Sequence, residues 1–247
     1  MEIKIKDQKI NYQITGMGKS VVILHGWGSS KSVFKSLIEF LSATHQVIAL
    51  DLPGFGESES LKTPWTLDDY VDAVKEFLKE LKIKNPTLIG HSFGGRISIK
   101  LGSSDDVKLD KIILIDSAGI RRKKSSLKVK LLKILKNTIG RLMPSLVMKM
   151  KNKLGSTDYK NANPIMKETL VNVIKEDLEP LLPKVKYSTL LIWGVNDQDT
   201  PIEDAYIMES KIKDSGLVKI ENAGHYSFLD NPYLTNQVIE IFLGGGK

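Results

Sequence analysis

The chain has 247 residues, of which 41% are hydrophobic, and its formal net charge is +7. This length supports one sizeable hydrophobic core with an insertion, so a single large α/β domain is the first expectation. The absence of cysteine excludes disulfides, thiol catalysis and thiolate metal sites, and the spacing of the four histidines does not favour a zinc centre. The chemistry of this protein must therefore use oxygen and imidazole groups.

The N-terminal residues alternate between polar and apolar side chains, which predicts a β-hairpin over residues 1–15 instead of a secretion signal. No apolar run approaches the length of a membrane span. We therefore expect a cytoplasmic protein. Residues 18–20 (GKS) resemble the end of a phosphate-binding loop, but Gln13 occupies the position that requires glycine, and the segment precedes a strand. No nucleotide site is expected there.

Strands and helices alternate along the chain. Short apolar runs predict buried strands over residues 21–24, 46–50, 87–89, 111–116, 188–193 and 217–220. Most segments between them have helical spacing, and Thr66 and Asp69 form the pattern of a capping box at the start of one helix. This alternation predicts a mostly parallel sheet with helices on both faces and with ligand sites at the carboxyl ends of the strands.

The strand pattern stops over residues 120–183, where apolar residues recur at helical spacing. We interpret this segment as an inserted helical cap between two core segments, residues 1–119 and 184–247. Within it, residues 117–157 contain twelve Lys or Arg and no Asp or Glu, so the rest of the chain has 24 basic and 29 acidic residues and a net charge of −5. One basic segment therefore accompanies a mildly acidic body.

The sequence GHSFG, residues 90–94, lies between a predicted strand and a predicted helix. In the G-x-S-x-G pattern, the serine occupies the apex of a strained turn, and the flanking glycines let the chain pass closely enough to expose the hydroxyl. Ser92 is therefore the candidate nucleophile. A serine hydroxyl is a weak nucleophile, so it needs a base, and the base needs a carboxylate that orients it.

His225 is the candidate base, because it follows the last predicted strand and precedes a helix that opens at Asn231. His25 and His91 are rivals. His91 neighbours Ser92 in the chain and should point away from it at the turn. His25 more plausibly braces the first loop by hydrogen bonds.

Asp197 is the candidate acid, because it lies just past the predicted strand over residues 188–193, and the next strand, residues 217–220, leads to His225. The order Ser, Asp, His is that of the α/β-hydrolase arrangement. Two other carboxylates compete for this role: Asp199 is two residues away, and Asp116 ends an earlier strand. Asp51, at another strand end, is interpreted as a structural hydrogen-bonding residue.

Acyl transfer also needs donors that face the developing oxyanion. The backbone N–H of Phe93 follows the nucleophile at a helix N-terminus, and that of Trp27 lies in the glycine-flanked loop after the first buried strand. These two groups are the predicted oxyanion hole, and their side chains would line the acyl pocket.

These motifs together resemble those of the α/β-hydrolase superfamily, in its group of cap-bearing serine esterases. The matching pieces are HGWG, DLPGFGES, GHSFGG, WGVND and GH, at residues 25–28, 51–58, 90–95, 193–197 and 224–225. The resemblance covers essentially the whole chain. It implies an eight-stranded sheet, a triad of Ser92, Asp197 and His225, oxyanion donors at Trp27 and Phe93, and a cap inserted after the sixth strand.

We therefore expect a serine hydrolase, without cofactor or metal, that cleaves carboxylic esters or thioesters through an acyl-enzyme. The same triad also serves carbon–carbon bond hydrolysis and N-terminal aminopeptidases, and a ligand-binding member of the fold without turnover is the alternative outside enzymes. A small-molecule acyl ester is the expected substrate, and no nucleic-acid partner is expected. The basic cap is either a solvated helix face or a docking surface for an anionic carrier or membrane.

Overall fold

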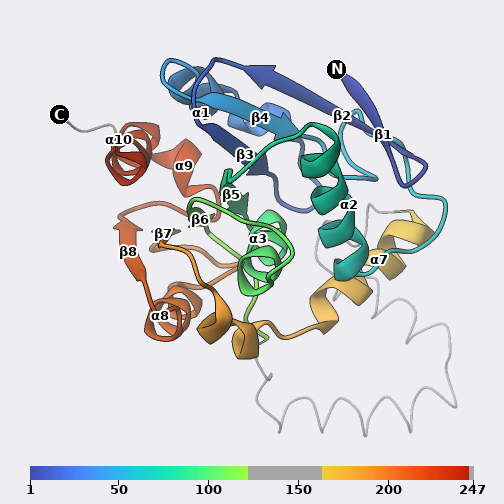
Figure 1. Cartoon of the computed structure of the whole chain (residues 1–247). Helices are drawn as coiled ribbons and strands as arrows, with labels where there is room; N and C mark the ends of the chain where they lie inside the picture. The colour runs from blue at the N-terminus through green and yellow to red at the C-terminus, as the bar shows by residue number, and fades with distance from the viewer. Residues whose placement is uncertain (122–162, 245–247) are drawn as a thin grey trace, which may run out of the picture.

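The computed structural model describes residues 1–121 and 163–244, and an eight-stranded sheet lies at the centre of the molecule (Figure 1). The strands are β1 (Glu2–Ile5), β2 (Gln8–Thr15), β3 (Ser20–Leu24), β4 (Gln46–Leu50), β5 (Thr87–His91), β6 (Ile112–Ile115), β7 (Thr189–Gly194) and β8 (Ser215–Ile220). Their order in the sheet is β1-β2-β4-β3-β5-β6-β7-β8. β1 and β2 form the predicted hairpin, β2 is antiparallel to β4, and the other neighbours are parallel. The predicted fold class is confirmed.

Helices cover both faces of this sheet (Figure 1). They are η1 (Lys31–Phe34), α1 (Lys35–Leu41), α2 (Leu67–Glu80), α3 (Phe93–Ser103), α7 (Pro164–Lys175), η2 (Glu179–Lys184), α8 (Ile202–Lys211), α9 (Ser227–Asp230) and α10 (Pro232–Leu243). The predicted capping box begins α2: the Thr66 side chain accepts from the N–H of Asp69, whose carboxylate accepts from the N–H of Thr66. Among the described residues, no helix is both long and apolar enough to cross a membrane.

Alternation along the strands separates two hydrophobic cores. In β3, Val22 and Leu24 belong to the core beneath α2, α3 and α8, whereas Val21 and Ile23 belong to the core beneath α1 and α10. The other central strands divide their side chains in the same way. Because a parallel strand is buried on both faces, it appears in the sequence as a continuous apolar run, which is why these strands were predictable.

Most of the predicted cap, residues 122–162, lies outside the described residues. The described end of the predicted cap contains α7 and η2, and α7 contributes Met166 and Val173 to the core beneath α2, α3 and α8. The cap boundaries therefore remain a prediction, as does the docking of an anionic partner on the basic segment.

The helix α3 approaches the sheet closely at its first turn. A methyl group built on Gly94 would lie 2.1 Å from the carbonyl oxygen of Leu24 at the end of β3. The N–H of Gly94 donates to the carbonyl of His25 at 3.1 Å, so the contact is between backbones. No side-chain rearrangement can relieve a clash with backbone, and glycine is therefore required here.

We predict that Gly94→Ala lowers the free energy of unfolding by about 1–3 kcal/mol or more, because the added methyl group must push α3 away from β3. Urea denaturation measures the loss. Gly216→Ala in β8 is the matched control, because a methyl group there meets no atom within 4 Å. Equal changes in the two variants would contradict the close-approach explanation.

Candidate active site

Ser92 occupies a sharp turn between β5 and α3. Its backbone has φ 48° and ψ −107°, a left-handed φ that a non-glycine residue rarely adopts. The N–H of Ser92 donates to the carbonyl of Ile115 in β6, and its carbonyl accepts from the N–H of Gly95 and Ala118. A methyl group on Gly90 would lie 2.6 Å from the carbonyl oxygen of Gly94. These contacts explain the glycines on either side of the serine.

Three loops at the carboxyl ends of the strands bring Ser92, His225 and Asp197 together. Ser92 Oγ lies 3.0 Å from Nε2 of His225, and His225 Nδ1 lies 2.8 Å from Oδ2 of Asp197. Asp197 follows β7, and His225 follows β8. The three side chains that the sequence analysis selected therefore form one chain of hydrogen bonds.

The Asp197 carboxylate is buried and accepts hydrogen bonds at both oxygens. Oδ1 accepts from the N–H groups of Asp199 at 2.8 Å and Thr200 at 3.0 Å, and the Thr200 hydroxyl lies 2.7 Å from Oδ2. Burial by itself would raise the pKa of Asp197, but hydrogen bonds from His225 and Thr200 lower it below its ordinary value. Asp197 is therefore held as a carboxylate.

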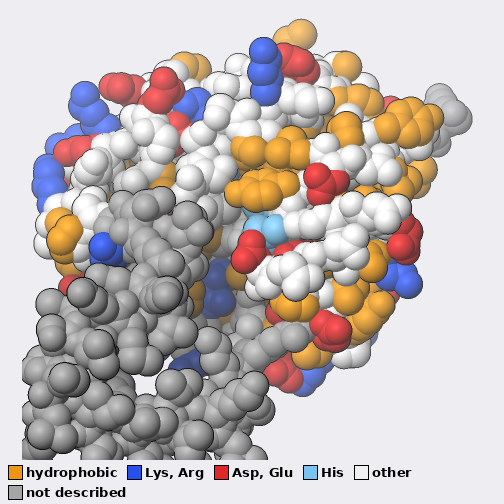
Figure 2. Space-filling view, turned by 180° about the vertical axis from the view of Figure 1, so that it is seen from behind, with side chains coloured by type: hydrophobic (Ala, Val, Ile, Leu, Met, Phe, Trp, Pro, Cys, Tyr) orange, Lys and Arg blue, Asp and Glu red, His pale blue; other side chains and the backbone are white. Residues whose placement is uncertain are grey.

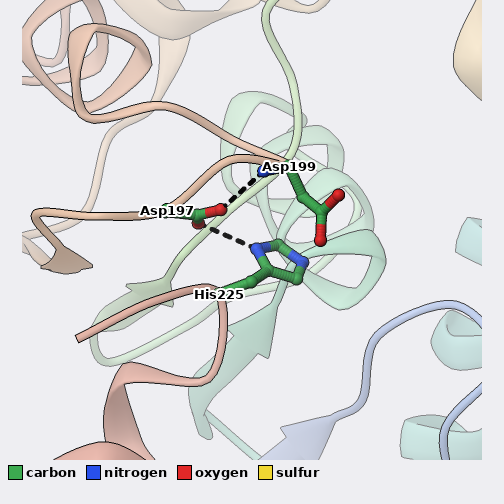
Figure 3. Close-up of side chains that lie close together, drawn as sticks. All are labelled: Asp197, Asp199 and His225. Atoms are coloured by element: carbon green, nitrogen blue, oxygen red, sulfur yellow. Dashed lines mark hydrogen bonds and ion pairs between the residues drawn. The ribbon is translucent and has the colours of Figure 1, made fainter.

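The imidazole of His225 lies between two carboxylates, with Asp197 on one side and Asp199 on the other (Figure 3). Burial would lower the pKa of His225, but the hydrogen bond and charge of Asp197, with the charges of Asp199 and Asp116, raise it above its ordinary value. The exposed Asp199 carboxylate is not the partner of Nδ1. Its effect on the imidazole is electrostatic.

Asp197, Asp199 and His225 each offer a ligand atom within 4.8 Å of the others, a distance that could hold a metal ion. The Asp197 carboxylate, however, has hydrogen-bond donors at both oxygens, from Asp199 N–H, Thr200 and His225. A carboxylate has about four lone-pair positions, and all are taken by these donors. The arrangement therefore suits proton transfer and does not suit metal coordination.

The rival histidines are buried and support the backbone. His25 Nδ1 donates to the carbonyl of Gly26 at 2.7 Å, and its Nε2 accepts from the N–H of Leu52 at 2.9 Å, so it braces the first loop as predicted. His91 Nε2 donates to the carbonyl of His225 at 2.7 Å, and the Ser92 hydroxyl bonds His225 instead of His91. Burial lowers the pKa of His25 to about 4 and that of His91 to about 3, so both are neutral at physiological pH.

The other candidate carboxylates also have structural partners. Asp116 accepts from the N–H of Gly194 at 2.8 Å and from the N–H and hydroxyl of Ser227 at 2.9 and 2.7 Å. Burial raises its pKa to about 6. Asp116 therefore ties the end of β6 to β7 and to the loop after His225, and its carboxylate does not bond the imidazole. Asp51 accepts from the backbone N–H and the ammonium of Lys31 at 2.7 and 2.8 Å.

A cavity of about 450 Å³ opens beside Ser92 and His225. Trp27 and Phe93 line it, and their backbone N–H groups donate to no group among the described residues. Two unpartnered donors beside a serine hydroxyl can bind a developing oxyanion. Side chains from α7, together with Ala118, Arg96, Asp199 and Tyr226, form other parts of the lining. On this side of the molecule, hydrophobic and acidic side chains border a histidine at the surface (Figure 2).

Sequence reasoning missed two residues of this site. Thr200, whose hydroxyl lies 2.7 Å from Asp197 and 3.2 Å from His225 Nδ1, carries no motif, although its place three residues after Asp197 could have suggested a supporting role. Arg96 lines the cavity from the first turns of α3, and its position four residues after the nucleophile is the available signal.

Comparison with known proteins identifies the family to which this fold belongs. Residues 19–145 match the family model described as "alpha/beta hydrolase fold". The chain is 28% identical to "Uncharacterized hydrolase YugF" of Bacillus subtilis, over 94% of this chain and 92% of that one. It is 24% identical to human "Monoacylglycerol lipase ABHD6", over 92% and 76%. Among solved structures, an esterase from Exiguobacterium antarcticum superimposes with a TM-score of 0.78 and 25% identity, over 98% of both chains.

We predict that Asp199→Asn lowers the pKa of His225, because the neutral amide no longer favours the imidazolium. An NMR titration of the histidine C2–H resonances measures the shift. Asp110→Asn is the matched control, since it removes the same charge near the start of β6, at the opposite end of the strand from the site. An unchanged His225 pKa in Asp199→Asn, or an equal shift in both variants, would contradict this role for Asp199.

Proposed function

Because the chain belongs to the α/β hydrolase fold family, we propose that it is a serine hydrolase that cleaves carboxylic esters through an acyl-enzyme intermediate. The single observation that carries the proposal is the continuous hydrogen-bond chain from Ser92 Oγ through His225 to Asp197. This is the arrangement that nucleophilic acyl transfer requires of a serine, a base and an orienting carboxylate.

In the first half-reaction, Ser92 Oγ attacks the acyl carbon and its proton passes to Nε2 of His225. The charge of Asp197 stabilises the imidazolium that forms, and the raised pKa of His225 is consistent with this task. The oxyanion accepts hydrogen bonds from the N–H groups of Trp27 and Phe93. When the tetrahedral intermediate collapses, the carbon–oxygen bond of the ester breaks, and the leaving alcohol takes the proton from His225.

In the second half-reaction, water attacks the acyl-enzyme. His225 accepts a proton from the water, and the carboxylic acid leaves as Ser92 Oγ takes the proton back. Both half-reactions use the same oxyanion donors and the same base. These steps use the three side chains, the two backbone N–H groups and water, and a thioester would follow the same steps.

Carboxylic esters are the substrate class that we favour. Much of the cavity lining is apolar, through Ala118, Leu170 and Val173, and such a lining suits the hydrocarbon part of an acyl group. The names of two similar proteins, a monoacylglycerol lipase and an esterase, refer to ester cleavage. A panel of acyl esters, carrier-linked thioesters and aminoacyl amides would establish the reaction class and the acyl length together.

We predict that Ser92→Ala folds normally and loses turnover of an activated ester such as 4-nitrophenyl butyrate, because the nucleophile is removed while the turn is kept. Ester hydrolysis and thermal melting are measured on the same preparation. Covalent labelling by a fluorophosphonate should occur on Ser92 in the unmodified protein and disappear in the variant. Retained turnover or labelling at another residue would overturn the assignment.

We predict that Asp197→Asn lowers kcat by about 10⁴-fold, because an amide favours the wrong tautomer of His225. Asp116→Asn is the comparison: it should lower the free energy of unfolding by about 1–3 kcal/mol through weakened buried hydrogen bonds, with a much smaller loss of kcat. Steady-state kinetics and urea denaturation distinguish the two variants. The opposite pattern would assign the acid to Asp116.

A further inference from the structure

Arg96 is a buried cation that the proposed reaction steps do not use. It belongs to the first turns of α3, four residues after Ser92, and only 4% of its surface is exposed. Its side chain lines the same cavity as Ser92. Nη2 donates to the backbone carbonyl of Glu176, and Nε is buried without a hydrogen-bond partner.

The carboxylates near this guanidinium already have other partners. Both oxygens of Glu176 accept from the ammonium of Lys100, at 2.8 and 3.0 Å. Asp177 Oδ1 accepts from the N–H groups of Arg121 and Glu179. Among the described residues, no carboxylate forms an ion pair with Arg96.

The sequence outside the described residues adds little negative charge. Residues 122–162 include one acidic residue, Asp158, against twelve Lys or Arg. Burial lowers the pKa of Arg96 to about 10, partly opposed by the charges of Glu176 and Asp177, so the guanidinium remains charged at neutral pH. A buried guanidinium that no carboxylate of the described residues contacts directly is only partly compensated, and an arginine in this state is suited to bind a carboxylate.

We propose that Arg96 binds a second carboxylate on the acyl part of the substrate, so that the preferred substrates are half-esters of short dicarboxylic acids. The inference rests on the proposed function. The ester carbonyl would lie at Ser92 and the oxyanion donors, the methylene groups would lie against Ala118 and Val173, and the free carboxylate would face Arg96. Asp199 lies beside His225, the group that protonates the leaving alcohol, so its negative charge faces the uncharged part of the substrate.

The test compares two kinds of ester of equal shape. Monoethyl succinate, glutarate and adipate carry the carboxylate, and in the neutral counterparts an isopropyl group replaces it. The kcat/KM of the unmodified protein should be higher for the half-esters. In Arg96→Met it should fall by about 10- to 100-fold for the half-esters, mainly through KM, and change little for the neutral esters.

Lys75→Met is the matched control, because it removes one positive charge from the neighbouring helix α2, where Lys75 pairs with Asp72 and Asp106, and Lys75 does not line the cavity. It should leave the preference for half-esters unchanged. Glutarate should inhibit neutral-ester hydrolysis competitively in the unmodified protein and in Lys75→Met, and weakly in Arg96→Met. If Arg96→Met does not fold, two other measurements test the proposal: the kinetics of Arg96→Lys and the inhibition of the unmodified protein by glutarate. Arg96→Lys should keep part of the preference for half-esters, because lysine keeps the positive charge.

Equal losses on both kinds of ester, a preference for the neutral esters, or no inhibition by glutarate would overturn the assignment of Arg96. Those results would leave the proposed function intact as long as Ser92 is labelled by a fluorophosphonate and neutral esters are hydrolysed. Failure of the unmodified protein to hydrolyse any ester, together with no labelling of Ser92, would instead overturn the proposed function.

Discussion

The close backbone contact between the first turn of α3 and the end of β3 is the constraint on which the candidate site depends. It fixes three groups at once. The N–H of Gly94 donates to the carbonyl of His25, so the turn that presents Ser92 is joined directly to the loop that contains Trp27. Phe93 is the residue between Ser92 and Gly94. The nucleophile and both proposed oxyanion donors are therefore positioned by one contact, and a side chain at Gly94 would displace all of them together.

The imidazole is positioned by a second set of bonds, which hold the loop around it. The carbonyl of His225 accepts from His91, the residue just before the nucleophile, and the N–H and hydroxyl of Ser227 donate to Asp116 at the end of β6. The ends of β5 and β6 thus determine where the base lies. Because each of these partners is buried, the hydrogen bonds are shielded from water and any one of them is costly to leave unmade. A loop of this kind can hold an imidazole within hydrogen-bonding distance of a serine in the absence of substrate.

The fold and the three central side chains could be predicted from the sequence because each produces a local sequence pattern. Buried parallel strands appear as apolar runs, and the turn at Ser92 requires glycines at fixed offsets. Thr200 and Arg96 belong to no such pattern. Thr200 is a common residue in a loop, and Arg96 looks like a charged position in an ordinary helix. Their roles arise from segments distant in the chain: Thr200 lies against Asp116 and Asp197, and Arg96 against Glu176. Contacts of this kind depend on tertiary packing, which periodicity does not record.

The same distinction separates the reaction from its substrate. A triad and an oxyanion hole must satisfy the same geometry whatever acyl group is cleaved, so the motifs that reveal them are shared by enzymes with unlike substrates. The cavity beside Ser92 is different, because its charges face the substrate: Asp199 lies by the imidazole, and Arg96 lies one turn along α3. Two opposite charges in a partly apolar cavity of about 450 Å³ produce a field with a direction. Under the proposed assignment of Arg96, a substrate with one charged end is oriented by that field before it meets the nucleophile, and a neutral ester of the same size is not. On that proposal, specificity resides in the placement of charge along the cavity.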